Sequence, residues 1–287
     1  MIVVKLKGGL GNQMFQFATG RSVALLNNTE LKIDKGWFKR NRKNDTYRNY
    51  SLNIFSYNPK FAKKNEILKL KTKDIIRRVG SKLLSMENKR YYIKEKKDVF
   101  EKKIFKLKDA YLDGYWQSYK YFDRIKDTLK RDFKIEINLD KKNSKILKEI
   151  KKSQSIAIHV RRGDYIKNEK FKKVFHASKP EYYYKSIKYI GKKIKNPKYF
   201  VFSNDITWCK ENLKGNRDIF FVEDNESTED LFLMKNCKNH IIANSSFGWW
   251  PAYLNSNKNK VVIAPKKWFK NKNRDSSNRI PKKWIRL

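Results

Sequence analysis

An apolar run leads directly into a basic turn in the segment Ser155-Ile156-Ala157-Ile158-His159-Val160-Arg161-Arg162-Gly163-Asp164-Tyr165. The apolar part has the composition of a buried strand, and the turn presents two guanidinium groups and a carboxylate. Ligands of open α/β sheets bind beyond the carboxyl ends of the strands. The planar fork of arginine matches phosphate oxygens. This segment therefore predicts an anion site, although a solvated basic turn in which Asp164 pairs with an arginine is an alternative.

The sequence after this segment alternates between short apolar runs and helical patterns. Apolar runs at 199–202, 219–222 and 240–243 indicate strands. Segments 180–195, 206–213 and 228–236 have the spacing or the start signals of helices. Strands that alternate with helices predict a parallel, doubly wound sheet with right-handed crossovers.

Two further strand ends carry polar clusters, Ser203-Asn204-Asp205 and Asn244-Ser245-Ser246-Phe247-Gly248-Trp249-Trp250-Pro251. Small hydroxyl residues at a strand-to-helix turn direct backbone N–H groups and a helix N-terminus toward an anion. Each cluster alone is also typical of helix capping. Three clusters at one edge of one sheet predict a nucleotide phosphate site, where Asp205 or Asp230 accepts hydrogen bonds from a ribose or a guanine.

The N-terminal half opens with a strand at 2–6, a glycine turn and a helical pattern at 13–26. The turn lacks the third glycine of a dinucleotide-binding fingerprint, because Met14 stands there. Its unusual feature is the amide pair Asn12-Gln13, which we expect at the mouth of the sheet. A plain glycine turn between strand and helix is the alternative.

Adjacent aromatic residues and an amide follow a short strand in Tyr111-Leu112-Asp113-Gly114-Tyr115-Trp116-Gln117-Ser118. Aromatic faces beside amides suit a sugar ring, and burial of the aromatics at a domain junction is the alternative. The irregular region 30–108 predicts charged helices that cover the first domain. One helix is expected along the apolar positions from Phe122 to Phe133, and another over 140–152.

Length and composition favour two domains of ordinary size with real cores, since 39% of residues are hydrophobic. No run of 18 apolar residues spans a membrane. The N-terminus has the pattern of a strand rather than of a signal peptide, and Cys209 and Cys237 form no disulfide framework. We expect a cytoplasmic protein.

The formal net charge of +40 is compatible with nucleic acid, an anionic membrane surface or an anionic substrate. Basic residues are spread along the whole chain and form no recognisable nucleic-acid module. We therefore expect no nucleic acid as partner, and expect peripheral contact with anionic lipids on the inner face of the plasma membrane. A basic nucleic-acid-binding protein is the distant alternative.

Metal ligands are not a feature of this sequence. It has no Asp-x-Asp triplet, which metal-dependent sugar-nucleotide enzymes commonly use, and His159, His176 and His240 are scattered. We predict no metal and no cofactor, so that positive side chains stabilise a leaving diphosphate.

Three of these motifs together resemble the bacterial α-1,2-fucosyltransferases of glycosyltransferase family 11. They are Gly8–Gln16, His159–Tyr165 and Asn244–Trp250, and the segments 113–118 and 202–205 are similar to the family's intermediate motifs. The motifs occur in family order across nearly the whole chain. The lysine-rich region 57–108 matches no motif, and its role stays open.

The resemblance implies an α/β, GT-B-like fold with two Rossmann-like domains facing a cleft. Residues 1–152 would form the acceptor-side domain and residues 153–287 the domain that binds GDP-fucose. It implies metal-independent, inverting transfer of L-fucose from GDP-L-fucose to O2 of a terminal β-galactoside. The acceptor would be a galactose-terminated glycan, for example a lipid-linked unit in O-antigen or capsule synthesis. Transfer to another hydroxyl or sugar is the alternative.

The resemblance and the motifs together give the expected site residues. Distantly similar fucosyltransferases have an arginine at the place of Arg161 that contacts the β-phosphate, and their pockets suggest Asp230 near the guanine. The general base stays open between Asp164, Glu169 and the leaving phosphate itself. The expected catalytic residues are Arg161, Asp164 and Asn12; the donor-binding residues are Arg162, Asn204, Asp205, Asp230, Asn244, Ser245, Ser246 and Phe247; the acceptor-binding residues are Gln13, Tyr115, Trp116 and Gln117.

Overall fold

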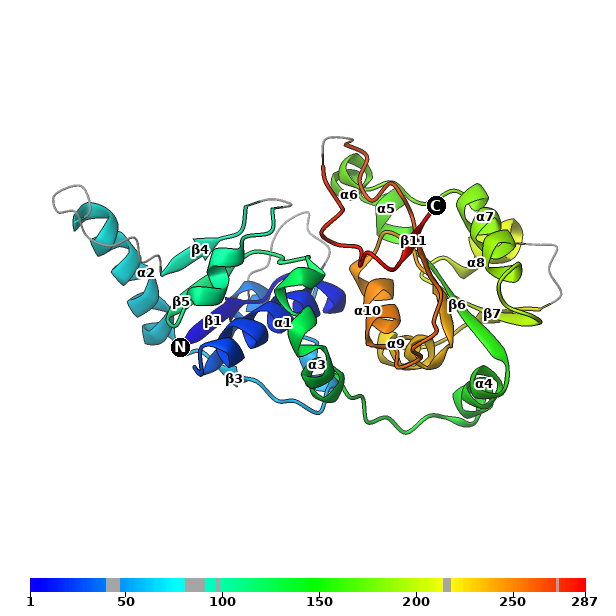
Figure 1. Ribbon diagram of the computed structural model, residues 1–287, viewed down its shortest axis with the longest axis horizontal. Helices are drawn as coiled ribbons and strands as arrows, with labels where there is room; N and C mark the ends of the chain where they lie inside the picture. The colour runs from blue at the N-terminus through cyan, green and yellow to red at the C-terminus, as the bar shows by residue number, and fades with distance from the viewer. Residues whose placement is uncertain (40–46, 81–90, 97–98, 214–217, 272–273) are drawn as a thin grey trace. The chain divides into compact units, whose positions relative to one another are not determined.

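The computed structural model describes residues 1–39, 47–80, 91–96, 99–213, 218–271 and 274–287. The chain divides into two compact units, Met1–Lys134 and Ile135–Leu287. Each unit contains one parallel β-sheet with helices packed against it (Figure 1).

Among the described residues, the sheet of the first unit has five parallel strands in the order β3-β2-β1-β5-β4. Since β1 lies at the centre, it is apolar and buried along most of its length. The strands are β1 (Ile2–Lys5), β2 (Leu31–Asp34), β3 (Lys60–Phe61), β4 (Tyr92–Lys94) and β5 (Ala110–Asp113).

Helices cover both faces of this sheet. Helix α1 (Leu10–Leu26) lies so close to β1 that a Cβ atom on Gly20 would meet Val4 Cγ2 at 2.2 Å. On the opposite face, Leu70 of α2 (Lys64–Gly80) packs with Val3 and Tyr111. Successive residues of β1 thus face different helices, as the period of a strand requires.

The connections of the first unit differ from the sequence-based expectation. The apolar positions 122–133 do not form one helix: 3-10 turns precede the short α3 (Lys126–Asp132). Within its described residues, region 30–108 holds the strands β2, β3 and β4 besides the long helix α2. The 3-10 turns of the unit are Gly36–Lys39, Leu52–Ile54, Lys102–Lys106, Tyr119–Tyr121 and Asp123–Ile125.

In the part of the second unit that the structure describes, six parallel strands form a sheet in the order β11-β10-β9-β6-β7-β8. The longest, β6 and β7, pair along their whole length. The strands are β6 (Gln154–Val160), β7 (Pro197–Ser203), β8 (Ile219–Val222), β9 (Asn239–Ile241), β10 (Val262–Ala264) and β11 (Ile285–Arg286).

The two faces of this sheet bury separate apolar clusters. Ile156 and Ile158 face α7 and α8, whereas Ala157 faces α4 and α9 on the other side. The unit is therefore a three-layer sandwich. Its helices are α4 (Lys141–Lys152), α5 (Gly163–Lys167), α6 (Glu169–Val174), α7 (Pro180–Gly191), α8 (Ile206–Asn212), α9 (Ser227–Asn236) and α10 (Ser246–Leu254).

The predicted α/β class with two Rossmann-like sheets is confirmed. The division between the units falls before α4, whereas the sequence placed it after residue 152. Ile146 and Ile150 explain this difference, because they pack α4 onto the sheet and α9 of the second unit.

Candidate active site

Three neighbouring strands bring the polar clusters of the second unit to one edge of the sheet. The parallel strands β9, β6 and β7 are adjacent, so the loops after them start at the same edge. Asn204 Oδ1 accepts a hydrogen bond from Arg162 N at 3.1 Å, and the Tyr165 hydroxyl donates to Asn244 O at 3.0 Å. The predicted convergence of the three loops is confirmed.

Arg161 is the first residue after β6 and is held in a fixed orientation. Its Nη2 donates to Asp164 Oδ2 at 2.7 Å, and its guanidinium carbon lies 6.0 Å from the centre of the Tyr165 ring. The side chains of Arg161 and Asp164 are 22% and 15% exposed. The ion pair between Asp164 and an arginine, which the sequence offered as the alternative for this turn, is therefore present, and part of the Arg161 side chain stays accessible.

Arg162 contacts the loop after β7 instead. Its guanidinium carbon lies 3.9 Å from the centre of the Trp208 ring, and Nε donates to Asp205 Oδ2 at 3.4 Å. Asp205 also accepts from Trp208 N as the N-cap of α8. Of the two adjacent arginines, Arg162 thus ties two loops together.

The third loop places a helix N-terminus at the same edge. Ser245 caps the nine-residue helix α10, with its Oγ accepting from Phe247 N at 3.2 Å. Ser246 and Phe247 in the first turn are half-buried. Unpaired N–H groups and the helix dipole favour an anion at such an N-terminus.

Asn244, expected to bind the donor, has a structural role. Its Nδ2 donates to the carbonyl oxygens of His176 at 2.9 Å and Trp268 at 2.8 Å. Because the side chain is 1% exposed, it fixes the loop from the inside.

His159 lies beneath this edge as a neutral ring. Burial, with a smaller contribution from the positive charge of Arg161, lowers the pKa of His159 to about 3. A Cβ atom on Gly248 would meet the ring's Nδ1 at 2.4 Å, and Phe247 packs with its centroid at 5.8 Å. His159 therefore adds no positive charge to the site and sets the position of α10.

Asp230 lies on α9, which follows β8, two strands from β6. Burial raises the pKa of its carboxyl to about 7, against the lowering effect of a hydrogen bond from Asn225 Nδ2 at 3.2 Å. Burial of an ionised carboxylate is costly unless hydrogen-bond donors compensate it. Asp230 is therefore suited to accept further hydrogen bonds from a ligand.

The other proposed base, Glu169, is open to solvent. Its side chain is 71% exposed and pairs with Lys172 at 3.1 Å on α6. Both candidate bases are therefore ion-paired, Glu169 with Lys172 and Asp164 with Arg161.

In the first unit, α1 begins at the carboxyl edge of the sheet and brings Asn12 to the turn after β5. Asn12 Oδ1 accepts a hydrogen bond from Gln117 Nε2, so the structure joins two residues that the sequence singled out separately. Gly8 makes this possible: its φ is +78°, and a Cβ atom there would meet Asn12 Nδ2 at 2.7 Å.

Two expected acceptor contacts are corrected by burial. Gln13 is 0% exposed, and its amide is bonded to Gly8 O, Asn49 O and Ser51 N. Trp116 is also 0% exposed and packs edge-on against Tyr121. Both side chains belong to the core, whereas Tyr115 is 42% exposed and remains available.

No three potential metal-ligating side chains gather anywhere within the residues that the structure describes. Within the same ranges, no helix combines the length and the apolar character needed to cross a membrane.

Comparison with known proteins identifies the family. The whole chain, residues 1–287, matches the description Glycosyl transferase family 11. The chain belongs to glycosyltransferase family 11. It is therefore a glycosyltransferase, as its motifs predicted.

Relatives of this glycosyltransferase are named for α-1,2 transfer and for O-antigen synthesis. It is 35% identical to an Alpha-1,2-colitosyltransferase of Escherichia coli, over 100% of this chain and 99% of that protein. It is 33% identical to the O-antigen biosynthesis glycosyltransferase WbnK of Escherichia coli, over 98% and 99%. The Galactoside alpha-(1,2)-fucosyltransferase 1 of Homo sapiens is 26% identical over 52% of this chain and 44% of its own length.

The fold of the glycosyltransferase has a solved counterpart. A mutant of Arabidopsis thaliana FUT1, solved in complex with GDP, superposes with a TM-score of 0.52 at 12% identity. The match covers 93% of this chain and 71% of that one. The predicted GT-B-like class is confirmed at the level of the fold.

Proposed function

We propose that this glycosyltransferase transfers L-fucose from GDP-L-fucose to O2 of a terminal β-galactoside, with inversion and without a metal ion. The observation that carries the proposal is Arg161, partly exposed at the edge of the sheet where three polar loops meet. Family membership and the α-1,2 linkage in the names of two relatives support the reaction class.

The proposed reaction is a single displacement. The acceptor O2 attacks C1 of fucose and forms the new C1–O bond while the bond from C1 to the β-phosphate oxygen breaks. Negative charge grows on the departing diphosphate, so preorganised donors act most strongly in the transition state. Arg161 and the N-terminus of α10 are the groups assigned to that charge.

The remaining donor contacts follow from the neighbouring loops. Asp230 is assigned to the guanine, because its buried carboxyl has spare accepting capacity. Ser246 is assigned to the phosphates through its backbone N–H group at the start of α10. Phe247 is assigned to the same turn, where its own N–H donates to Ser245 Oγ. Arg162, Asn204 and Asp205 shape this pocket through their mutual hydrogen bonds.

The proton of O2 must leave during the attack. Asp164 holds the Arg161 fork through Oδ2, which makes orientation its first role. The proton acceptor is then Asp164 itself, Glu169, or an oxygen of the leaving diphosphate.

A second donor is favoured by one specific observation, the 35% identity to a colitosyltransferase along the whole chain. Colitose is L-fucose without its 3-hydroxyl group, so the two donors share the GDP, the ring and the anomeric centre. The same site and mechanism would serve both.

The natural acceptor we propose is a galactose-terminated glycan, lipid-linked in O-antigen synthesis. The +40 net charge would hold the protein peripherally on anionic lipids of the cytoplasmic membrane face, since each nearby Lys or Arg contributes roughly 1 kcal/mol there. Nucleic acid is not a partner in this proposal.

The test is incubation with GDP-fucose or GDP-colitose and a panel of β-galactosides, in buffer with and without EDTA, followed by NMR of the product linkage. We expect an α-1,2-fucosyl product whose yield is the same in EDTA. Transfer only from GDP-colitose would favour the second donor. A different linkage, or turnover abolished by EDTA, would contradict the proposal.

A further inference from the structure

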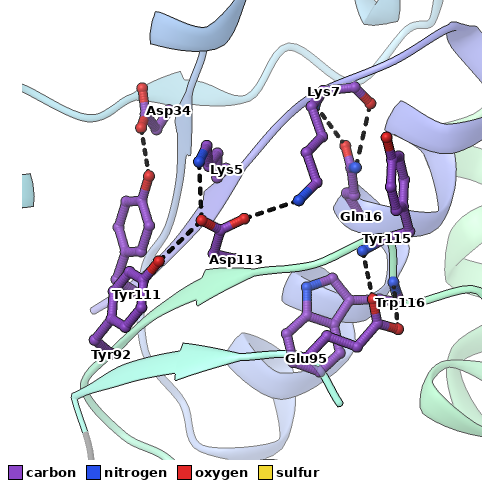
Figure 2. A network of polar contacts seen from close by, with 10 residues as sticks. All are labelled: Lys5, Lys7, Gln16, Asp34, Tyr92, Glu95, Tyr111, Asp113, Tyr115 and Trp116. Atoms are coloured by element: carbon purple, nitrogen blue, oxygen red, sulfur yellow. Dashed lines mark hydrogen bonds and ion pairs between the residues drawn. The ribbon is translucent and has the colours of Figure 1, made fainter. Parts of the chain in front are cut away.

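The turn after β5 is held by a single carboxylate, that of Glu95. Glu95 Oε2 accepts from Tyr115 N at 2.6 Å, and Oε1 accepts from Trp116 N at 2.8 Å (Figure 2). Hydrogen bonds from two backbone N–H groups to one ionised carboxylate are stronger than neutral ones. Glu95 was not among the residues predicted from the sequence.

The turn needs such support because its backbone is unusual. Trp116 has a φ of +53°, in the left-handed region that bulky residues rarely adopt. A Cβ atom on Gly114 would lie 2.3 Å from Glu95 Cβ, so the turn and Glu95 are in direct contact. The result is that Trp116 points into the core while Tyr115 points outward.

Lys7 supports the Tyr115 ring from the neighbouring strand end. Its Nζ lies 4.8 Å from the centre of the ring and 2.9 Å from Asp113 Oδ1. The backbone of Lys7 is fixed by the buried amide of Gln16, which accepts from its N–H at 2.9 Å and donates to its carbonyl oxygen at 3.2 Å. Tyr115 is therefore positioned by its own backbone and by a cation at its ring, while 42% of it stays exposed.

Asp113 anchors this arrangement and takes no part as a base. It accepts from Lys5 at 2.8 Å, from Lys7 and from the Tyr92 hydroxyl at 3.0 Å (Figure 2). Burial raises the pKa of Asp113, but the hydrogen bonds from the two lysines outweigh it and lower the pKa to about 2. Asp113 is consequently ionised at every physiological pH.

We propose that Glu95 is the positioning residue of an acceptor sugar subsite in the first unit, in which the Tyr115 ring stacks on a pyranose. This inference rests on the proposed function, because it assumes a glycan acceptor. An aromatic ring offers a large apolar surface at small entropic cost, and a preorganised one loses less freedom on binding. Gln117, two residues after Tyr115, donates a hydrogen bond to Asn12 Oδ1. The same turn therefore links the Tyr115 ring to the amide that was predicted to be catalytic.

The experiment measures initial rates against lactose at saturating GDP-fucose for Glu95→Gln, Tyr115→Ala, Tyr115→Phe and the double variant Glu95→Gln/Tyr115→Ala. An amide presents an N–H to one of the two backbone donors, so the turn loses its support. We expect the KM for lactose to rise roughly tenfold in Glu95→Gln and in Tyr115→Ala. Tyr115→Phe keeps the ring and should resemble the wild type, and kcat should change less than about twofold.

The double variant separates positioning from independent effects. If Glu95 acts through Tyr115, the KM of the double variant equals that of Tyr115→Ala. The matched control is Glu30→Gln, which removes a carboxylate paired with Lys60 at the opposite edge of the same sheet and should leave the KM unchanged. Thermal unfolding and GDP titration of each variant check that the fold and the donor site are intact.

The subsite would be overturned if the increase in KM of the double variant equalled the product of the two single increases. An unchanged KM in Tyr115→Ala would also overturn it. Direct titration of lactose by NMR separates this inference from the proposed function. If the wild type transfers neither sugar but binds lactose, and Glu95→Gln and Tyr115→Ala lose that affinity, the proposed function is contradicted and the subsite is supported. If the wild type transfers fucose and both variants keep its lactose affinity, the proposed function is supported and the subsite is contradicted.

Discussion

Arg161 Nη2 and Asp164 Oδ2 form an ion pair at 2.7 Å at the carboxyl end of β6. The two residues are three positions apart, on either side of the start of α5. One carboxylate oxygen thus fixes the plane of the guanidinium fork, and the fork keeps N–H groups for a second anion.

Asp164→Asn should lower kcat through misorientation of Arg161 and should keep the shape of the pH–rate profile. An amide can still accept from Nη2 but no longer as an ion, so we expect a loss of roughly tenfold to a hundredfold. The measurement is kcat against pH for both proteins. Disappearance of the acidic limb in Asp164→Asn would instead identify Asp164 as the general base.

Asp230→Asn should stabilise the unliganded protein increasingly as the pH rises from 5 to 8. Burial raises the folded-state pKa of Asp230 to about 7, against an ordinary value of 3.8. The folded protein therefore holds a proton that the unfolded chain releases, and the stability that this proton confers is lost as the pH rises from 3.8 to about 7.

Thermal unfolding of wild type and Asp230→Asn at several pH values checks this. If the difference in Tm between the two proteins is the same at pH 5 and pH 8, the pKa of the Asp230 carboxyl is not raised in the folded protein. Asp127→Asn, on the exposed side of α3 in the other unit, is the control and should behave like wild type.

In His159→Gln, the free energy of unfolding should fall less steeply with decreasing pH than in the wild type. The folded-state pKa of about 3 lies below the ordinary histidine pKa of 6.5, so at pH 5 the unfolded ring binds a proton that the folded ring does not. The stability that the neutral ring contributes is present above pH 6.5 and is lost as the pH falls toward 3.

From pH 7.5 to 5, the advantage of the wild type over His159→Gln should shrink by about 2 kcal/mol, which is 1.36 kcal/mol for each pH unit below 6.5. Urea unfolding of both proteins at the two pH values gives this number. An advantage that is independent of pH would mean that the ring is protonated within the fold.

The loop cluster of the second unit could be predicted because its signals are local. The mostly apolar β6 and β7 are followed at once by polar residues, and the apolar residues 241–243 at the end of β9 precede Asn244. Parallel pairing then brings the strand ends together. The sequence left two roles of Asp164 open, general base and ion-pair partner, because Asp164 lies close to Arg161 in the chain and can pair with it.

The acceptor side could be predicted only in part. Sequence identifies Tyr115 and Trp116 as adjacent aromatics, but a left-handed φ at Trp116 decides which one is buried. The residue that supports this turn, Glu95, lies 20 positions earlier, after a three-residue strand that alternation cannot detect. Gln13 was misjudged for a related reason, because its partners Asn49 and Ser51 lie in a distant loop.

The central claim is that the guanidinium of Arg161 stabilises the departing diphosphate, and Arg161→Lys tests it most directly. Lysine keeps the charge and loses the fork, so we expect kcat with GDP-fucose to fall by about 10²–10³ and to approach that of Arg161→Ala, while GDP affinity changes much less. A kcat of Arg161→Lys near that of the wild type would contradict the account.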